Sequence, residues 1–171
     1  MNRNKFSKVT LEQYLIDTKR ELPIEVLTEE YENIRIPCRG TKYSAGYDFF
    51  SPFDFELRTG ETILIPTGIR VELEKDKFLQ MAPRSGLGFK YRLQMDNTIP
   101  IIDSDYVMSD NQGHIMLKLT NDSKNKNNDL SIRAGQGIAQ GIILQYFLTE
   151  DDDQDYKPER NGGLGSTTKT A

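Results

Sequence analysis

Short apolar runs separated by turn residues dominate the chain from residue 24 onward. Several runs alternate apolar and polar positions, which is the two-residue period of a half-buried β-strand. Turn residues separate them, for example at Thr59-Gly60 and Pro66-Thr67-Gly68. We predict strands at 24–27, 46–50, 53–57, 61–65, 68–73, 78–82, 113–120, 130–132 and 141–147. Many short strands at close spacing are typical of an all-β sandwich or barrel, such as a jelly roll.

A helical pattern precedes these strands. Leu11, Leu15 and Leu22 recur near helical spacing, Thr10 is a suitable N-cap, and Pro23 ends the pattern. We predict a helix over 11–21 that packs on the main body; a partner-binding helix is the alternative. The expected organisation is an N-terminal helical extension (1–21), a β domain (22–149), and an acidic linker with a mobile, Gly-rich C-terminal arm (150–171).

Length and charge exclude several classes of function. A chain of 171 residues suits a single domain. A formal net charge of −4 argues against binding to nucleic acid. No apolar run reaches the roughly 18 residues of a membrane helix, and the N-terminal residues lack the apolar core of a secretory signal. We therefore expect a cytoplasmic protein with neither a membrane nor a nucleic acid as partner.

Cys38 and His114 are the only cysteine and the only histidine. One cysteine excludes an internal disulfide framework and a Cys-rich zinc site, and we expect Cys38 to be a small buried hydrophobe. Without a Cys-His cluster, zinc deaminase chemistry has no ligand set. His114 lies in a strand-like alternation, so we expect a structural role and not a Ser-His-Asp triad.

The stretch 97–106 reads Asn-Thr-Ile-Pro-Ile-Ile-Asp-Ser-Asp-Tyr. If it is extended, Asp103 and Asp105 point to the same face; in a bulge or turn they diverge. One carboxylate would then orient a water and accept its proton, and the Tyr106 ring would offer a flat surface to a sugar. The alternative is a hairpin in which both Asp side chains cap backbone amides in Asx-type turns.

Four further signatures accompany this stretch in a fixed order. In chain order they are Ser44-Ala45-Gly46-Tyr47-Asp48, Ala82-Pro83-Arg84-Ser85-Gly86-Leu87-Gly88, Gly137-Ile138-Ala139-Gln140 and Gly162-Gly163-Leu164-Gly165-Ser166-Thr167. With 97–106, the set closely resembles the trimeric dUTP diphosphatase (dUTPase) family over about 22–168. The resemblance implies a jelly-roll-like fold and hydrolysis of dUTP to dUMP and diphosphate.

The resemblance assigns the phosphate contacts. Arg84, Ser85 and Gly86 match family residues on the phosphate chain, with Ser85 against the departing bridging oxygen, and Gln140 matches another phosphate contact. Such residues supply a fixed cation, a hydroxyl donor and a bare backbone. Asp48 matches the acidic residue that helps hold hydrated Mg²⁺, the implied cofactor. Taken alone, Arg-Ser-Gly reads as an ordinary turn, Gln140 as a strand-edge amide and Asp48 as a hydrogen-bonded strand-end residue.

The resemblance also assigns the nucleoside contacts. Asp103 matches the carboxylate that activates the attacking water, and Tyr106 matches the ring that packs on deoxyribose and rejects a ribose 2′-hydroxyl. Asn97, with the backbone at 99–101 and at Ile102, would read the uracil edge. Thymine would be excluded by steric overlap and cytosine by mismatched hydrogen-bond polarity.

The C-terminal arm resembles the segment that closes over the substrate. Arg160 would clamp the γ-phosphate, and the glycine amides and hydroxyls around it, at Gly163, Gly165, Ser166 and Thr167, would wrap the same phosphate. Leu164 would form an aliphatic lid over uracil. The family forms homotrimers with three shared sites. One subunit supplies the phosphate and metal residues, a second supplies the base, sugar and water-activating residues, and the arm usually comes from a third. Taken alone, the segment is a disordered tail.

Four positions depart from the family pattern. Leu164 stands where a Phe commonly stacks on uracil, and Arg160 is one residue closer to the Gly-Gly pair than usual. Pro100 replaces a usual Gly in the uracil hairpin, which stiffens the loop and removes an amide donor. Met108 replaces a Gly two residues after Tyr106. These departures predict a differently shaped base pocket.

Two other functions remain as alternatives. A dCTP deaminase, or its bifunctional form, shares the fold but carries a different signature, Arg-Ser-Ser. The sequence Arg84-Ser85-Gly86 therefore argues against a deaminase. A regulatory protein-binding module, as some phage-borne members of the family are, would use a protein partner, for which the N-terminal extension leaves room.

Overall fold

The computed structural model describes residues 4–152 and residue 160. Strands dominate it, as predicted. The first half of the chain forms β1 (Lys5–Lys8), α1 (Leu11–Thr18), α2 (Ile24–Glu32), β2 (Cys38–Arg39), β3 (Tyr47–Phe50), β4 (Phe55–Leu57), β5 (Thr62–Pro66), β6 (Ile69–Glu72) and β7 (Lys77–Pro83). The second half forms α3 (Ser85–Tyr91), β8 (Leu93–Met95), β9 (Ile101–Asp103), a 3₁₀ turn η1 (Tyr106–Met108), β10 (Met116–Asn121), β11 (Leu130–Ile132) and β12 (Gly137–Gln145).

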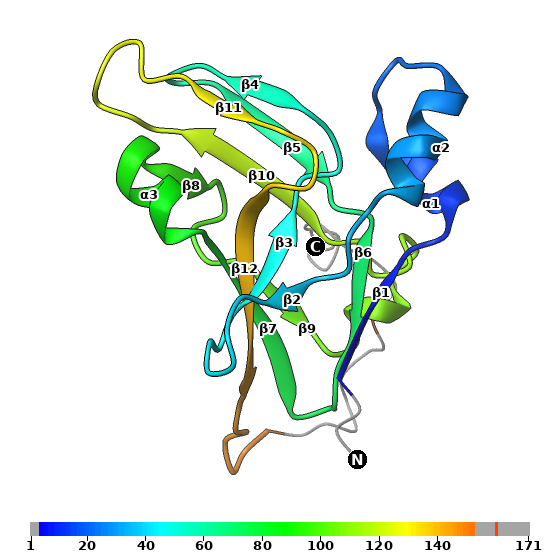
Figure 1. Ribbon diagram of the computed structural model, residues 1–171. Helices are drawn as coiled ribbons and strands as arrows, with labels where there is room; N and C mark the ends of the chain where they lie inside the picture. Colours follow the sequence, from blue (N-terminus) through cyan, green and yellow to red (C-terminus); the bar gives the residue numbers. More distant parts are fainter. Residues whose placement is uncertain (1–3, 153–159, 161–171) are drawn as a thin grey trace, which may run out of the picture.

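The strands pair antiparallel in small sheets that surround one core (Figure 1). The largest sheet has the order β2-β3-β12-β7-β9, and another has the order β5-β10-β8. Two-stranded sheets join β11 to β4 and β1 to β6. Strand β12 is long and central in Figure 1, and α3 lies on the opposite side of the molecule from α1 and α2. The predicted jelly-roll-like arrangement is therefore present.

Alternation along the strands builds the core. Leu79 and Met81 of β7 and Leu117 and Leu119 of β10 are each at most 1% exposed, while their strand neighbours are more accessible. Each fully buried side chain of this size contributes about 2 kcal/mol by leaving water. Because alternate residues of a strand face opposite sides, the sequence period that predicted these strands also selects their buried face.

The N-terminal extension packs into this core. Strand β1 pairs with β6, and α1 begins after Thr10, whose side chain accepts a hydrogen bond from the Gln13 amide as a helix N-cap. Tyr14 is fully buried in the main hydrophobic cluster. The helix ends at Thr18, before the predicted end at residue 21, because Lys19 adopts the left-handed conformation with φ 46°. The extension is thus a packed element of the body.

Two predictions in this region are wrong. The segment 24–27 is the first turn of α2 and not a strand, and only Leu27 among the residues of α2 is buried. Four residues with alternate apolar positions are too few to separate the two periods, and the acidic helix-forming residues that follow extend the helix. Cys38 is exposed, because it lies in the two-residue edge strand β2.

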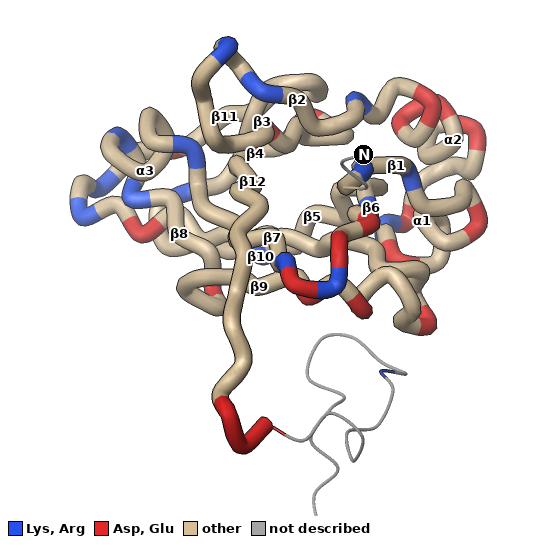
Figure 2. Tube along the Cα trace, turned by 90° about the horizontal axis from the view of Figure 1, so that it is seen from below, with Lys and Arg blue, Asp and Glu red and all other residues tan. Residues whose placement is uncertain are grey.

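Charge is unevenly distributed over the surface. Figure 2 shows Asp and Glu gathered on α1 and α2, and Lys and Arg gathered around α3. No helix within residues 4–152 is long and apolar enough to cross a membrane.

Candidate active site

Strand β9 brings Asp103 to the edge of the largest sheet. It pairs with β7, so that Asp103 lies opposite Phe78. The strand ends at Asp103, and Ser104 and Asp105 form a turn that leads into η1. The extended arrangement considered for this stretch is therefore replaced by a turn. Both carboxylates nevertheless converge on one partner, because the turn swings Asp105 back toward the end of the strand.

That partner is Arg160. Its Nη2 donates to Asp103 Oδ2 at 2.6 Å, and its Nε lies 3.0 Å from Asp105 Oδ1. Its guanidinium carbon lies 5.5 Å from the centre of the Tyr106 ring, within range of a cation–π contact. The side chain is 19% exposed. Arg160 thus offsets the charge of both carboxylates and covers the ring that the resemblance assigns to deoxyribose.

The hydroxyl of Tyr106 is held by two hydrogen bonds. Its hydroxyl donates to the His114 carbonyl at 3.1 Å and accepts from Asn111 Nδ2 at 3.0 Å. The residue is 7% exposed, and burial raises the pKa of its hydroxyl, with Asn111 acting in the opposite direction. The ring therefore has a fixed position, with Arg160 over it.

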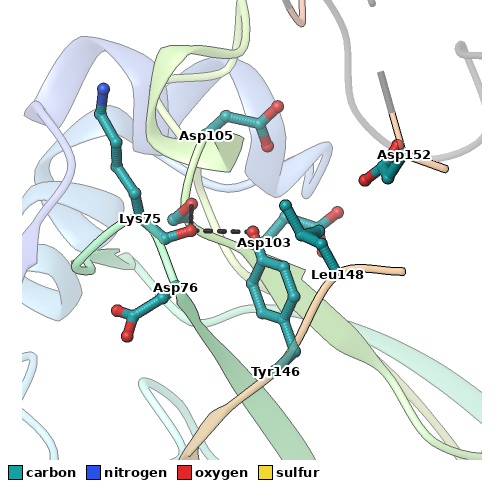
Figure 3. A pocket seen from close by; sticks show the side chains of 8 residues that line it. Lys75, Asp76, Asp103, Asp105, Tyr146, Leu148 and Asp152 are labelled. Carbon is teal, nitrogen blue, oxygen red and sulfur yellow. Dashed lines mark hydrogen bonds between the residues drawn. The ribbon is translucent and has the colours of Figure 1, made fainter. Parts of the chain in front are cut away.

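A cavity of about 660 Å³ opens beside these carboxylates (Figure 3). Its lining is Lys75, Asp76, Asp103, Ser104, Asp105, Tyr146, Leu148 and Asp152. The Tyr146 hydroxyl donates to the Lys75 carbonyl at 2.8 Å, and Tyr146 and Leu148 lie beside Asp103 in Figure 3. Sequence reasoning missed Lys75, Asp76 and Tyr146. The turn signal Glu74-Lys75-Asp76 between two apolar runs was the only hint of the first two.

The residues that the resemblance assigns to the phosphate chain gather at another place. Asp48 on β3 and Gln140 on β12 are cross-strand partners, and Gln140 also faces Ala82 of β7. Arg84 follows β7, and its Nε lies 3.4 Å from Asp48 Oδ1. Gln140 Nε2 donates to the Pro83 carbonyl at 3.5 Å. Three strands therefore bring Asp48, Arg84 and Gln140 together.

Ser85 and Gly86 occupy the first turn of α3, which replaces the ordinary turn that Arg-Ser-Gly suggests when taken alone. A Cβ added at Gly86 would meet no atom within 4 Å, so packing inside the chain does not require a glycine there. The cavity at this end measures about 540 Å³ and includes Arg35, Arg84 and Lys90 in its lining. Its cationic lining suits an anionic ligand.

Two glycines make room for the side chains of Arg84 and Gln140. A Cβ on Gly137 would lie 2.5 Å from Arg84 Nη1, and a Cβ on Gly46 would lie 2.5 Å from Gln140 Oε1. Both glycines belong to the quoted signatures, yet sequence reasoning gave them no role. Gly46 directly precedes β3 and Gly137 is the first residue of β12, and their bare backbone lets these long side chains lie across the strand ends.

The residues that the resemblance assigns to the base follow β8. Asn97 is exposed, and Thr98 adopts a left-handed conformation with φ 64°. Pro100 is buried, and its carbonyl accepts from the Met81 amide at 2.9 Å. Ile102 is half-buried on β9 opposite Leu79. The segment 97–102 therefore starts with a turn in which Thr98 has an unfavourable backbone conformation. After this turn, Pro100 and Ile102 hold the segment on β7.

Among residues 4–152 and 160, no three His, Cys, Asp or Glu side chains gather as direct metal ligands. Asp48 supplies a single carboxylate, 20% exposed, beside Arg84. This donor set fits Mg²⁺ held through water and substrate phosphates, because Mg²⁺ keeps several waters of hydration. The predicted arm residues Leu164, Gly165, Ser166 and Thr167 lie outside the described residues.

The two clusters lie at opposite ends of β7. Asp103 pairs with Phe78, which precedes Arg84 by six residues. At a rise of roughly 3.3 Å per residue, the two points on the strand are about 20 Å apart. One chain therefore does not bring its own Arg84 and Asp103 to the same phosphorus atom.

Comparisons of sequence and of fold with known proteins point to the same family. The dUTPase family model matches residues 32–168. The deoxyuridine 5′-triphosphate nucleotidohydrolase of Lactococcus lactis subsp. lactis is 35% identical over 146 residues, covering 84% of this chain and 95% of the relative. That of Dictyoglomus turgidum is 38% identical over 152 residues, covering 84% and 98%.

Solved structures agree in fold. The dUTPase of Streptococcus mutans superposes with a TM-score of 0.63 at 25% identity, covering 85% of this chain and 98% of that one. A mutant dUTPase from phage phi11 of S. aureus, described as coordinating a structural Mg(II) ion, has a TM-score of 0.63 at 20% identity, covering 89% and 96%.

The fold is that of an all-β protein with two separate clusters of polar residues, one around Asp48, Arg84 and Gln140 and one around Asp103, Asp105 and Arg160. The chain belongs to the dUTPase family, because the family model matches most of its length and its relatives are more than 30% identical over nearly their whole chains.

Proposed function

We propose that this protein hydrolyses dUTP to dUMP and diphosphate. The water oxygen forms a bond to the α-phosphorus, and the bond from that phosphorus to the bridging oxygen breaks, so that diphosphate leaves. The observation that carries the proposal is the division of the site into a cationic cluster and a carboxylate cluster, each built by the family's signatures.

Asp103 accepts the proton of the attacking water. Its side chain is 49% exposed beside the cavity, where a water can reach it. A carboxylate that orients a water and accepts its hydrogen bond contributes general-base catalysis. Asn97 and the backbone at Ile102 read the uracil edge, and Tyr106 supports the deoxyribose. A ribose hydroxyl would overlap the ring. Arg160 must leave the ring for a sugar to take its place.

The phosphate chain is held by Arg84, Ser85, Gly86 and Gln140. Arg84 contributes a guanidinium that bonds two oxygens, and the Ser85 hydroxyl supports the departing bridging oxygen. Asp48 holds hydrated Mg²⁺, which when bound offsets charge on the leaving diphosphate. Arg160 and the arm residues Leu164, Gly165, Ser166 and Thr167 close over the γ-phosphate.

The complete site forms between subunits of a homotrimer. The roughly 20 Å between Arg84 and Asp103 along β7 supports this, because the α-phosphorus must lie near both residues. A closed ring lets each subunit make the same contact with the next. The origin of the arm is a separate question, since Arg160 contacts Asp103 of its own chain.

Mixed trimers test the origin of the arm. Asp103→Asn is expressed together with a chain truncated after Asp155, each with its own tag, and doubly tagged trimers are purified. Each parent alone should be nearly inactive. If the arm acts on another subunit's Asp103, activity reappears in the mixture. Mixed trimers as inactive as both parents would show that the arm serves its own chain's Asp103.

The function itself is tested by diphosphate release from dUTP, dTTP, dCTP, UTP and dATP. We expect release from dUTP far above the others. Ammonia release from dCTP would instead indicate a deaminase. No release from any nucleotide by the folded, trimeric protein would refute the proposal.

A further inference from the structure

Helix α1 is tied at both ends to the loop 109–114, which comes directly after η1. At its start, the Thr10 amide donates to Gln112 Oε1 at 3.0 Å, and Gln112 Nε2 donates to Thr10 Oγ1 at 3.0 Å. Near its end, Asp17 Oδ2 lies 2.7 Å from His114 Nδ1. These residues are about 100 positions apart in sequence, so the helix and the loop are joined by specific tertiary contacts.

The bond between Asp17 and His114 has a defined direction. His114 Nε2 accepts from the Gly68 amide at 2.8 Å, so the ring proton lies on Nδ1 and is donated to Asp17. His114 is fully buried, and burial lowers its pKa, against the opposing influence of the Asp17 carboxylate. Gln13 Nε2 donates to the same carboxylate oxygen at 2.9 Å, which fixes its orientation.

The same loop fixes Tyr106. The His114 carbonyl accepts both from the Tyr106 hydroxyl at 3.1 Å and from Asn111 Nδ2 at 3.2 Å. Gly113 has φ +72°, and a Cβ on it would lie 2.6 Å from Val107 Cα and 2.9 Å from the Tyr106 carbonyl oxygen. The hydroxyl of Tyr106 and the backbone that follows it, at Val107, are therefore both packed against the loop that α1 holds.

We propose that Asp17 is a positioning residue for the sugar-binding ring of Tyr106. It acts through His114, and Gln112 supports it from the other end of the helix. The N-terminal extension thereby sets the discrimination between deoxyribose and ribose. The inference rests on the proposed function, since Tyr106 is assigned to the sugar there. A helix that only stabilised the fold would not affect that discrimination.

The test compares four full-length variants by their kcat and KM for dUTP and for UTP. Asp17→Ala removes the acceptor of the His114 proton. Asp17→Asn keeps an oxygen that can accept it. Glu12→Ala removes an exposed carboxylate of the same helix and serves as the matched control. Gln112→Ala breaks the contact at the other end, nearer the surface.

We expect Asp17→Ala to raise KM for dUTP and to lower the dUTP-to-UTP ratio of kcat/KM by about tenfold, with a smaller change in kcat. Asp17→Asn should restore the ratio, Glu12→Ala should leave it unchanged, and Gln112→Ala should lower it by a smaller factor. In a Tyr106→Phe background, Asp17→Ala should cause little further loss, because the hydroxyl anchor is already gone. An unchanged ratio in Asp17→Ala and Gln112→Ala, with only a lower melting temperature, would overturn the inference.

A second readout does not depend on activity. In protein carrying fluorotyrosine, the ¹⁹F signal of Tyr106 is assigned by its absence from Tyr106→Phe. That signal should shift in Asp17→Ala and stay in place in Glu12→Ala. If wild-type protein releases no diphosphate, the proposed function fails while this shift still reports the coupling. A Tyr106 signal unmoved by Asp17→Ala refutes the coupling whatever the activity.

Discussion

Gly137→Ala should disable the phosphate site while leaving the fold intact. The added Cβ would lie 2.5 Å from Arg84 Nη1 and 2.9 Å from Arg84 Cδ, closer than real Cβ atoms approach other atoms. Gly137 does not have a positive φ, so alanine fits its backbone. The obstructing atoms belong to a flexible side chain that is 46% exposed, so Arg84 moves aside and the strand stays in place.

The magnitude depends on the bonds that Arg84 loses. A hydrogen bond to a charged group contributes about 1.5–3 kcal/mol, and a displaced guanidinium forfeits at least one such bond to phosphate. Since 1.4 kcal/mol is tenfold, kcat/KM for dUTP should fall about 10- to 100-fold. The weak pair with Asp48, at 3.4 Å and partly exposed, adds little to stability, so the melting temperature should change by only a few degrees.

Gly88→Ala is the matched control for this substitution. A Cβ there meets no atom within 4 Å, and the residue lies inside α3, where alanine is favoured over glycine by about 1 kcal/mol. It should raise the melting temperature slightly with unchanged kcat/KM. Measuring diphosphate release beside thermal unfolding separates the two effects. Wild-type kcat/KM in Gly137→Ala would refute the role of Arg84 that is derived from this geometry.

Three further perturbations have defined outcomes. Asp103→Asn keeps the side-chain shape but removes the acceptor charge, so turnover should fall at least ~10²-fold with nucleotide binding largely retained; equal turnover would remove Asp103 from the mechanism. Excess chelator should suppress activity and Mg²⁺ restore it, since Asp48 is proposed to hold the ion through water; full activity in chelator would exclude that role. Burial lowers the pKa of folded His114 below its ordinary 6.5, so the unfolded chain binds the extra proton there. The free energy of unfolding should therefore fall as pH drops from about 7 to 5.5, by at most about 1.4 kcal/mol per pH unit, and His114→Gln should flatten the slope measured by denaturant titration.

Strand prediction succeeded where one face is buried. The segment 130–132 was predicted with its observed bounds, and Leu130 and Ile132 are buried on either side of exposed Ser131. Strands β1, β2, β8 and β9 were not predicted as such. Each is two to four residues long, and the exposed or half-buried residues of β1, β2 and β9 give little alternation. Pairing with a neighbouring strand creates these elements, and sequence pattern alone does not encode that pairing.

The candidate site also has features that the sequence indicates and features that it does not. The signatures select Asp48, Arg84 and Gln140, because their residue types and order carry the resemblance, and the structure brings these three residues together. The space that Gly46 and Gly137 leave for two of those side chains was not predictable, since it depends on cross-strand register and on side-chain direction. Residue types therefore indicate which chemical groups the site contains, whereas tertiary packing determines which of their atoms lie close enough to interact.

Arg160 is the residue for which sequence and tertiary packing differ most. From the sequence it is a cation in a glycine-rich tail, to be placed on a γ-phosphate by resemblance. In the structure it bonds Asp103, 57 positions away, and Asp105, and it covers Tyr106. No periodicity relates positions so far apart. A γ-phosphate competes with these carboxylates for the guanidinium, so under the proposed function Arg160 exchanges partners when dUTP binds. That exchange also leaves Asp103 Oδ2 open to the attacking water, because the triphosphate supplies the anionic oxygens that replace both carboxylates.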